Sequence, residues 1–243
     1  MRIWAEGGNV LLEAKDISVN YGHVEALKNA EFYVSTGEIV AMIGPNGAGK
    51  STALKAVFGL VELKGGSITF EGADVSNLRP DERVARGISL VPENRRIFSS
   101  MTVIENLEMG CFLRKDADTK TEIEKIFELL PALRERRNLK AGVLSTGEQQ
   151  MLSMGRALIQ KPKLLLADEP SAGLSPSYVD IIFDKLVEIS KQGISVLLVE
   201  QNARMALEIA NRGYVFTVGS IAKETQGHEM FEDDEVMRLL LGR

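Results

Sequence analysis

The chain has 243 residues, and its 29 Lys and Arg against 34 Asp and Glu give a formal net charge of −5. At roughly 150 residues per domain this length allows one or two domains, and the acidic balance argues against nucleic acid as a partner, because phosphate binding requires basic patches. A single cysteine excludes an internal disulfide framework, and no apolar run approaches the roughly 18 residues of a membrane span, so we expect a cytoplasmic protein that reaches a membrane only as a peripheral partner.

Short apolar runs alternate along the chain with longer segments of helical period, which is typical of an α/β fold. In the first part of the chain a helix is predicted directly after a Gly-rich loop, at residues 50–58. The apolar runs around it predict strands, which are expected at residues 10–21, 38–43, 67–70 and 88–91.

The middle of the chain is strongly charged and has helical character from Thr102 onwards. Thr102 and Glu105 have the spacing of a capping box at the start of one helix. Pro131 is expected to end a second helix, which begins at Thr119. We therefore predict a helical subdomain inserted into an α/β core, at about residues 94–160.

Two further apolar runs, at residues 164–167 and 195–199, predict buried parallel strands. After Gly213 the tail is expected to hold a short strand pair and then a charged amphipathic helix near residues 233–241. The domain organisation that follows is an N-terminal extension at residues 1–9 and a single domain at residues 10–243.

The most specific motif is the Gly-rich loop GPNGAGKS at residues 44–51, which matches G-x-x-x-x-G-K-[ST] at every fixed position. Its glycines let successive backbone N–H groups face one anion, and the helix that follows presents its positive N-terminal end to the same anion. The Lys50 ammonium can reach the β- and γ-phosphates of a nucleotide, and the Ser51 hydroxyl can ligate Mg²⁺. An apolar strand before this phosphate loop and a helix after it supply the context that the motif requires.

A second motif is the apolar run at residues 164–167, which ends in two carboxylates, Asp168 and Glu169. In a fold with a phosphate loop, such a strand lies beside the loop and its C-terminal end faces the ligand. Asp168 can then hold Mg²⁺, and Glu169 can polarise the attacking water as a general base. An acid at a strand end is more often a solvated turn when it stands alone, so this interpretation depends on the phosphate loop upstream.

A third motif, LSTGEQQ at residues 144–150, precedes an amphipathic segment. Ser145 and Glu148 have capping-box spacing, and a capped helix N-terminus is a ready anion site. With the phosphate loop and the acidic strand end in the same order, the chain resembles the ATP-binding subunits of ATP-binding cassette (ABC) transporters, from about Leu11 to Leu241. The signature of that family is L-S-G-G-Q/E, and this chain carries Thr146 at the first glycine.

The resemblance implies a P-loop NTPase fold of the ABC ATPase type, with a mainly parallel sheet, an antiparallel β subdomain and the inserted helical subdomain. It implies ATP and Mg²⁺ as cofactors, and a homo- or heteromeric dimer of nucleotide-binding domains with two ATP molecules at its interface. Closing of that dimer would drive membrane permease subunits at the inner face of the cell membrane. An extracytoplasmic solute-binding protein would be an indirect partner.

Residue by residue, the resemblance implies three sets of site residues. The adenine is expected to stack on the tyrosine, and the helix end at Ser145 is expected to come from the other subunit. The residues expected to bind the nucleotide are Tyr21, Gly44, Pro45, Asn46, Gly47, Ala48, Gly49, Lys50, Ser51, Thr52, Ser145, Thr146 and Gly147. Catalysis is expected of Glu169, Lys50, Gln201 and Glu93. Coordination of Mg²⁺ is expected of Ser51, Glu93 and Asp168.

Three positions depart from the family pattern. Glu93 stands where the family usually has Gln, and its carboxylate can still ligate Mg²⁺ or orient water. Gln201 stands in place of a usual His, so it can hydrogen-bond a phosphate but cannot switch its protonation as an imidazole does. Ser175 occupies a place where Asp is commonest. These departures fit a weakened or regulatory ATPase, and they equally fit a subfamily pattern.

Two segments favour one subfamily. Residues 91–98 and 199–203 look like those of the subunits that energise uptake of branched-chain and other hydrophobic amino acids. Closely similar subunits serve urea and short-amide importers, and other transport, a non-transport ABC machine and a regulatory nucleotide-binding module stay open as alternatives. In the family, the region of Arg95, Phe98 and Met101 helps line a groove that receives a helix of the membrane subunit.

Overall fold

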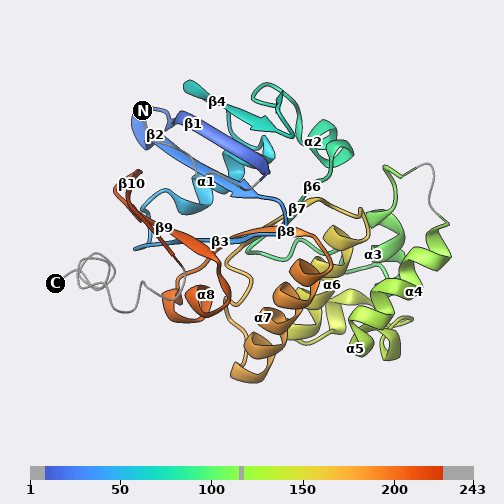
Figure 1. The fold of residues 1–243 in the computed structure, drawn as a ribbon. Coiled ribbons are helices and arrows are strands. Elements are labelled where there is room, and N and C mark those ends of the chain that lie inside the picture. Colours follow the sequence, from blue (N-terminus) through green and yellow to red (C-terminus); the bar gives the residue numbers. More distant parts are fainter. Residues whose placement is uncertain (1–8, 115–117, 227–243) are drawn as a thin grey trace.

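The computed structural model of the chain describes residues 9–114 and 118–226. The helix expected near residues 233–241, and all but the last residue of the expected N-terminal extension, lie outside the described residues. Within them the predicted α/β fold is confirmed, because two sheets lie beside a lobe of helices (Figure 1). Among the described helices, none has both the length and the apolar character that crossing a membrane requires.

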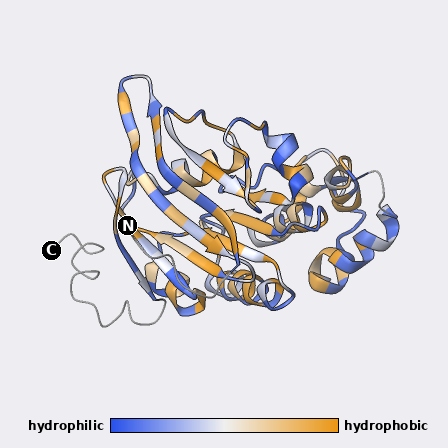
Figure 2. Cartoon of the chain, turned by 45° about the horizontal axis from the view of Figure 1, so that its top comes forward, coloured by the Kyte–Doolittle hydropathy of each residue, from blue (hydrophilic) through white to orange (hydrophobic). Residues whose placement is uncertain are grey.

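The first sheet is antiparallel and has the strand order β2-β1-β4-β5. Its strand β1 pairs on both sides, with Leu12 opposite Val34 of one neighbour and Phe70 of the other. Inward and outward residues alternate along much of the long strands, which gives them alternating hydrophilic and hydrophobic bands (Figure 2). The strands of this sheet are β1 (Val10–Tyr21), β2 (Val24–Ser35), β4 (Gly65–Phe70) and β5 (Ala73–Asp74).

The second sheet has the order β10-β9-β3-β8-β7-β6 and is parallel except for β10, which runs antiparallel to β9. Every residue of β3, β7 and β8 is buried, as expected for strands covered on both faces. The strands are β3 (Ile39–Ile43), β6 (Ile88–Val91), β7 (Leu164–Asp168), β8 (Ser195–Val199), β9 (Arg212–Thr217) and β10 (Ser220–Gln226). The predicted strand pair of the tail is therefore confirmed.

The two faces of the second sheet belong to two different cores. Val40 and Met42 of β3 pack with α1 (Lys50–Phe58) and with the first sheet. Ile39, Ala41 and Ile43 face the opposite way and pack with helices of the second half of the chain. Those helices are α6 (Thr146–Leu158), α7 (Pro176–Lys191) and α8 (Ala203–Ile209). Helix α1 thus lies between the sheets, with its N-terminus at the end of β3 (Figure 1).

The helical lobe lies in sequence between β6 and β7 and begins at a capping box. Thr102 and Glu105 form that box, as the sequence predicted, and a second box of Ser145 and Glu148 opens α6. Pro131 ends the second helix of the lobe as predicted, but it also begins the next short one directly. Besides α6 the lobe contains α3 (Val103–Gly110), α4 (Thr119–Leu129), α5 (Pro131–Glu135) and a 3₁₀ turn at Ala141–Val143.

The C-terminal end of α1 is tied to α2 (Pro80–Arg86) by Arg83, which is only 1% exposed. Its guanidinium donates hydrogen bonds to the carbonyls of Ala56 and Val57 at 2.6 Å each. It also donates to the carbonyls of Ser76 and Leu78 in the loop before α2. The last carbonyls of a helix have no partner within the helix. Arg83 therefore fixes one end of the helix whose other end carries the phosphate loop.

Replacement of Arg83 by Met should keep the side-chain volume and remove all of these donors. We expect Arg83→Met to lower the free energy of unfolding by about 3 kcal/mol, because buried carbonyls lose charged partners. Urea denaturation would measure the loss. Arg86→Met, on the exposed side of the same helix, is the control and should change stability by less than about 0.5 kcal/mol. Equal losses in the two variants would contradict the anchoring role of Arg83.

Candidate nucleotide-binding site

The phosphate loop connects the end of β3 to the start of α1 and uses glycines where the backbone requires them. Gly44 has φ 142°, and a Cβ atom at this position would lie 2.3 Å from the carbonyl oxygen of Phe216 in β9. Gly49 has φ 103° at the N-cap of α1, where a Cβ would lie 2.8 Å from the Ala26 carbonyl oxygen. A side chain at either position would push the loop away from the neighbouring backbone.

Lys50 lies inside the curl of this loop. Its ammonium donates to the carbonyl oxygens of Gly44 at 2.7 Å and Pro45 at 3.0 Å. Burial lowers the pKa of Lys50, while the nearby carboxylates, above all Glu169 and then Asp168, oppose that shift. The first N–H groups of α1 have no partner within the helix and point into the same loop. The loop thus offers a buried cation and open N–H donors, the combination that a phosphate needs.

A hollow of about 330 Å³ lies over the loop and brings most of the predicted site residues together. It is lined by residues 46–52 of the loop with Ala26, Glu93, Glu169 and Gln201. The predicted site residues that do not line it are Tyr21, Gly44, Pro45, Asp168 and residues 145–147. Tyr21 is 49% exposed at the end of β1.

Asp168 and Ser51 form the part of the site that could hold a metal ion. Asp168 ends β7, is 5% exposed, and accepts a hydrogen bond from the Ser51 hydroxyl at 2.8 Å. Burial raises the pKa of Asp168. The described residues contain no group of three or more His, Cys, Asp or Glu arranged for a metal. Mg²⁺ at a nucleotide takes only one or two carboxylates and fills its other positions with phosphate oxygens and water, so this pair fits such an ion.

Glu169 follows Asp168 in a left-handed backbone conformation, with φ 45°. Its N–H donates to the Val199 carbonyl at 2.8 Å, and its carboxylate accepts a hydrogen bond from Gln201 Nε2 at 2.7 Å. Burial raises the pKa of Glu169, and the charge of Glu93 raises it further. A carboxylate that is held by an amide and has a raised pKa can orient a water molecule and accept its proton.

Glu200 belongs to the site, although no motif in the sequence pointed to it. It follows β8, is 2% exposed, and accepts hydrogen bonds from the backbone N–H groups of Ser171 at 3.0 Å and Gln201 at 3.2 Å. Burial raises its pKa. Glu200 therefore joins the loop after Glu169 to the residue that holds the Glu169 carboxylate. Its position at the end of a buried strand, as with Asp168, was the available sequence signal.

The N-terminus of α6 carries the remaining predicted residues, Ser145, Thr146 and Gly147. The first two are exposed, while Gly147 is buried against Tyr178 of α7. A Cβ atom on Gly147 would lie 2.2 Å from Cγ of the Tyr178 ring. The absent side chain thus lets the starts of α6 and α7 pack directly on each other.

Comparison with known proteins identifies relatives along almost the whole chain. The family model for "ABC transporter" matches residues 27–172. The chain is 43% identical to the high-affinity branched-chain amino acid transport ATP-binding protein BraG of Pseudomonas aeruginosa, over 96% of this chain and 100% of that protein. It is 34% identical to the probable branched-chain amino acid transport ATP-binding protein LivF of Archaeoglobus fulgidus, over 96% and 99%. It is also 33% identical to the lipopolysaccharide export system ATP-binding protein LptB of Haemophilus influenzae, over 96% and 97%.

Among solved structures, the fold is similar to that of a nucleotide-free ATP-binding cassette from an ABC transporter. The TM-score is 0.85 at 29% sequence identity, and the match covers 96% of this chain and 100% of the other. The similarity supports both the two-sheet core and the helical lobe, since nearly all of each chain is matched.

Glu200→Gln removes a carboxylate that burial disfavours, and it also replaces one of the two oxygens that accept backbone N–H groups by an NH2 group. The change in melting temperature at one pH therefore combines a gain and a loss, but only the gain depends on pH. The pKa of Glu200 is higher in the folded chain than in the unfolded chain. Below the unfolded-state pKa the group is protonated in both states and does not affect stability. As pH rises from there towards the folded-state pKa, the buried carboxylate increasingly destabilises the fold. The Tm of the variant relative to that of the wild type should therefore be higher at about pH 7.5 than at about pH 4.5. Calorimetry at both pH values measures it.

The control is Glu62→Gln, which neutralises an exposed carboxylate and should leave Tm nearly unchanged. A Tm difference from the wild type that is the same at both pH values, or that changes with pH as much in the control, would contradict the explanation by burial.

Proposed function

Because the chain belongs to the ABC transporter family, whose ATP-binding domains hydrolyse ATP to power transport, we propose that it energises an importer of branched-chain or other hydrophobic amino acids from the inner face of the cell membrane. The observation that carries the ATPase assignment is the convergence of the phosphate loop, Glu93, Glu169 and Gln201 on one hollow. The solute assignment is supported by the relatives named for branched-chain amino acid transport, BraG and LivF.

In this proposal the residues in and beside the hollow divide the tasks of binding and hydrolysis. Lys50 and the N–H groups of the loop bind the phosphates, and Ser51 with Asp168 would hold Mg²⁺, together with Glu93. When bound, Mg²⁺ neutralises negative charge on the phosphates. Glu169 orients the attacking water and accepts its proton. Gln201 keeps the Glu169 carboxylate in place through the hydrogen bond described above.

A second nucleotide-binding domain completes the proposed site. Ser145 and Thr146 are exposed at a capped helix N-terminus, and they do not line the hollow of their own subunit. A nucleotide bound in the hollow of a partner subunit would give this helix end the anion that its N–H groups favour. Tyr21, exposed at the end of β1, is then available to stack on adenine.

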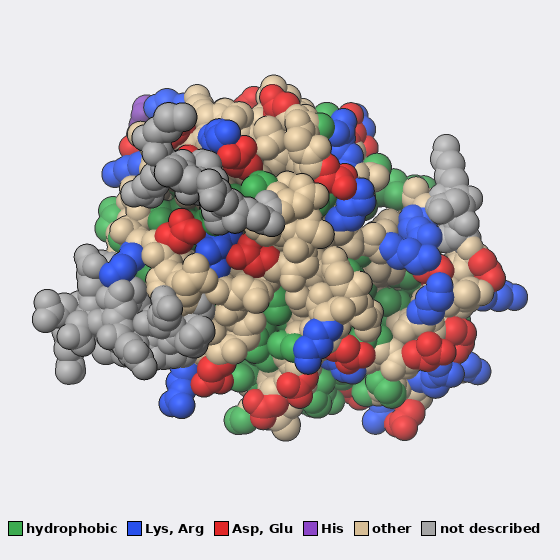
Figure 3. Space-filling view, viewed as in Figure 1, with side chains coloured by type: hydrophobic (Ala, Val, Ile, Leu, Met, Phe, Trp, Pro, Cys, Tyr) green, Lys and Arg blue, Asp and Glu red, His purple; other side chains and the backbone are tan. Residues whose placement is uncertain are grey.

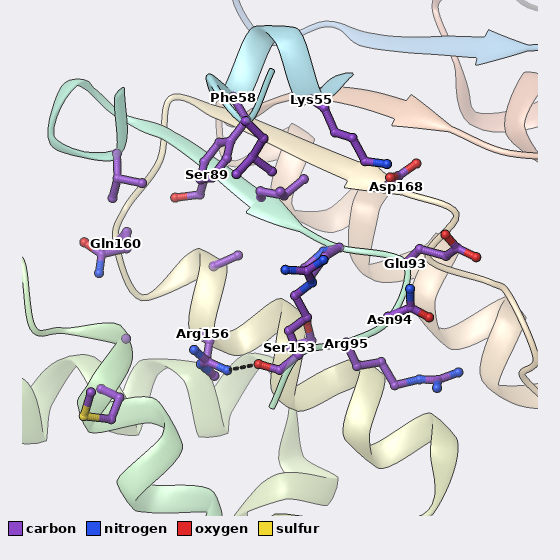
Figure 4. Close-up of a pocket in the computed structure, with 18 of the residues that line it drawn as sticks. Lys55, Phe58, Ser89, Glu93, Asn94, Arg95, Ser153, Arg156, Gln160 and Asp168 are labelled. Atoms are coloured by element: carbon purple, nitrogen blue, oxygen red, sulfur yellow. Dashed lines mark hydrogen bonds between the residues drawn. The ribbon is translucent and has the colours of Figure 1, made fainter. Parts of the chain in front are cut away.

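A groove between the sheets and the helical lobe is the proposed docking site for a permease. The groove has a volume of about 560 Å³ and is lined from both sides, by Lys55 and Phe58 of α1 and by Ser153 and Arg156 of α6 (Figure 4). The surface is indented between α2 and the lobe, with hydrophobic side chains visible there (Figure 3). Exposed apolar side chains at the groove are Leu60, Met109, Phe112 and Leu113.

Glu169→Gln is expected to reduce ATP hydrolysis by at least about 100-fold, because the amide cannot accept a proton from water. ATP binding should persist, since the phosphate loop is unchanged. Phosphate release and equilibrium nucleotide binding measure the two properties separately. Glu62→Gln, the same substitution at an exposed position, should hydrolyse ATP at the wild-type rate. Undiminished hydrolysis in Glu169→Gln would remove Glu169 as the base.

The solute and the docking groove can be tested together in cells that lack their own uptake of branched-chain amino acids. Co-expressed with its permeases and binding protein, the chain should restore uptake of labelled leucine. Phe112→Asp should lower this uptake at least about tenfold, because it places a charge on an apolar contact surface. Val143→Asp is the control. Val143 lies outside the groove, and its exposed fraction of 72% is similar to the 78% of Phe112.

The similarity to LptB supplies the second candidate, export of lipopolysaccharide. Failure to restore leucine uptake, together with rescue of cells depleted of a lipopolysaccharide-export ATPase, would favour that candidate. Restored uptake of urea or a short amide instead of leucine would correct the solute and leave the ATPase assignment intact.

A further inference from the structure

Strand β9 continues past the end of β3 and runs beside the phosphate loop. The two strands are parallel, and Ile43 at the end of β3 pairs with Val215 of β9 (Figure 1). The chain then passes Phe216, whose carbonyl lies close to the start of the loop at Gly44. A two-residue turn at residues 218–219 follows and leads into β10. This turn and the phosphate loop are therefore neighbours, although they lie far apart in the sequence.

The turn contacts the loop through Gly219. The Gly219 N–H donates a hydrogen bond to the Ala48 carbonyl at 2.9 Å. The Gly219 carbonyl accepts a hydrogen bond from the N–H of Lys28 in β2 at 2.8 Å. The Cα atom of Gly219 also lies 3.3 Å from the position that a Cβ atom of Gly49 would take. Gly219 is thus held between the phosphate loop and the first sheet.

The hydrogen bond to Ala48 orients the peptide group between Ala48 and Gly49. A trans peptide is planar, so its carbonyl and its N–H point in opposite directions. Because the Ala48 carbonyl is directed at the turn, the Gly49 N–H is directed away from it. Gly49 lines the hollow and Gly219 does not. Within the described part of the chain, no group accepts a hydrogen bond from the Gly49 N–H, so this donor is available to an anion in the hollow.

The backbone of the turn has a conformation that its first residue does not favour. Val218 has φ 45° and Gly219 has φ 80°, the left-handed pair of a type I′ turn. A β-branched residue is rarely found in this region. The Val218 side chain is 78% exposed, so its own packing does not impose the conformation. The backbone contacts of Gly219 with the loop and with β2 therefore maintain the turn.

We propose that Gly219 is a positioning residue of the phosphate site, which fixes the peptide between Ala48 and Gly49 so that the Gly49 N–H faces the phosphates of the bound nucleotide. This inference rests on the proposed role of residues 44–52 in binding those phosphates. A contact that strengthens nucleotide binding must itself be strengthened by the nucleotide, because coupling between two equilibria is reciprocal. The turn and the nucleotide thus stabilise each other through one peptide group.

The first test compares Gly219→Val with Gly72→Val in the full chain. Gly72 is a matched position, because it is the second residue of another two-residue turn, between β4 and β5, and has φ 76°. A Cβ atom at 72 would meet nothing within 4 Å, whereas at 219 it would lie 3.0 Å from the Ala26 carbonyl oxygen. Both variants therefore carry the same kind of backbone strain, but only Gly219→Val displaces the turn from its neighbours.

Gly219→Val should weaken the binding of ATP and of ADP at least about tenfold, because a donor to the charged phosphates is turned away. It should raise KM for ATP by a similar factor and leave kcat within about threefold, since the lost interaction is made before and during the reaction. Gly72→Val should lower Tm and retain the wild-type Kd and KM. Equilibrium nucleotide titration and steady-state phosphate release measure these values. Should Gly219→Val not fold, Gly219→Ala and Gly72→Ala replace the pair.

The second test measures amide hydrogen exchange in the wild-type chain with and without saturating ADP. Bound ADP should slow exchange at Gly219 several-fold, because the nucleotide stabilises the contact between the turn and the loop. Exchange at Gly72, which does not line the hollow, should change much less. Equal slowing in the two turns would overturn the coupling, because it would show only the general stabilisation that any ligand gives.

The outcomes separate this inference from the function on which it rests. Wild-type Kd and KM in Gly219→Val would overturn the positioning role, even if Lys50→Met has lost nucleotide binding. Equal loss of affinity in Gly72→Val would also overturn it, because strain in any turn would then suffice. Wild-type ATP binding by Lys50→Met would instead overturn the assignment of the phosphate loop, and the inference would fall with it.

Discussion

The parallel pairing of β3, β8 and β7 is the constraint on which the rest of the site depends. Met42 pairs with Val199, and Val199 pairs with Asp168, so three strand ends meet at one edge of the sheet. Each end is followed at once by a functional segment: the phosphate loop after β3, Glu169 after β7, and Glu200 with Gln201 after β8. A shift of one strand by a single residue would reverse the faces of its side chains and separate these groups.

The same convergence gathers charge in a buried place. Burial lowers the pKa of Lys50 and raises those of Asp168, Glu169 and Glu200, so each of these groups is less favourable in its charged form than it would be in water. Opposite charges and hydrogen bonds compensate part of this effect, as in the bonds from Ser51 to Asp168 and from Gln201 to Glu169. Groups with shifted pKa values that lie together at one edge of a sheet are a physical mark of a functional site.

Local patterns made much of the fold predictable. Strands β1, β6 and β8 and helix α1 have the predicted bounds, because their apolar runs are ended by turn residues or by the phosphate loop. Both capping boxes were visible as residues three apart. Strand β2 was not predicted, since its sequence VEALKNAEFYVS mixes polar and apolar residues and its register depends on pairing with β1. The contacts of Arg95 with Ala172 and of Glu200 with Ser171 join segments distant in sequence, which no local pattern reveals.

The contact between Gly147 and Tyr178 has a consequence for how the signature segment can vary during evolution. An aromatic ring at 178 is compatible with glycine at 147 alone, so any side chain at 147 calls for a smaller residue at 178. Thr146 has no such restriction, because it is exposed at the helix start. The chain accordingly carries Thr146 at the first glycine of the family signature and a glycine at the second, so the residue allowed at 147 depends on residue 178, although the rest of α6 and β7 separate the two in sequence.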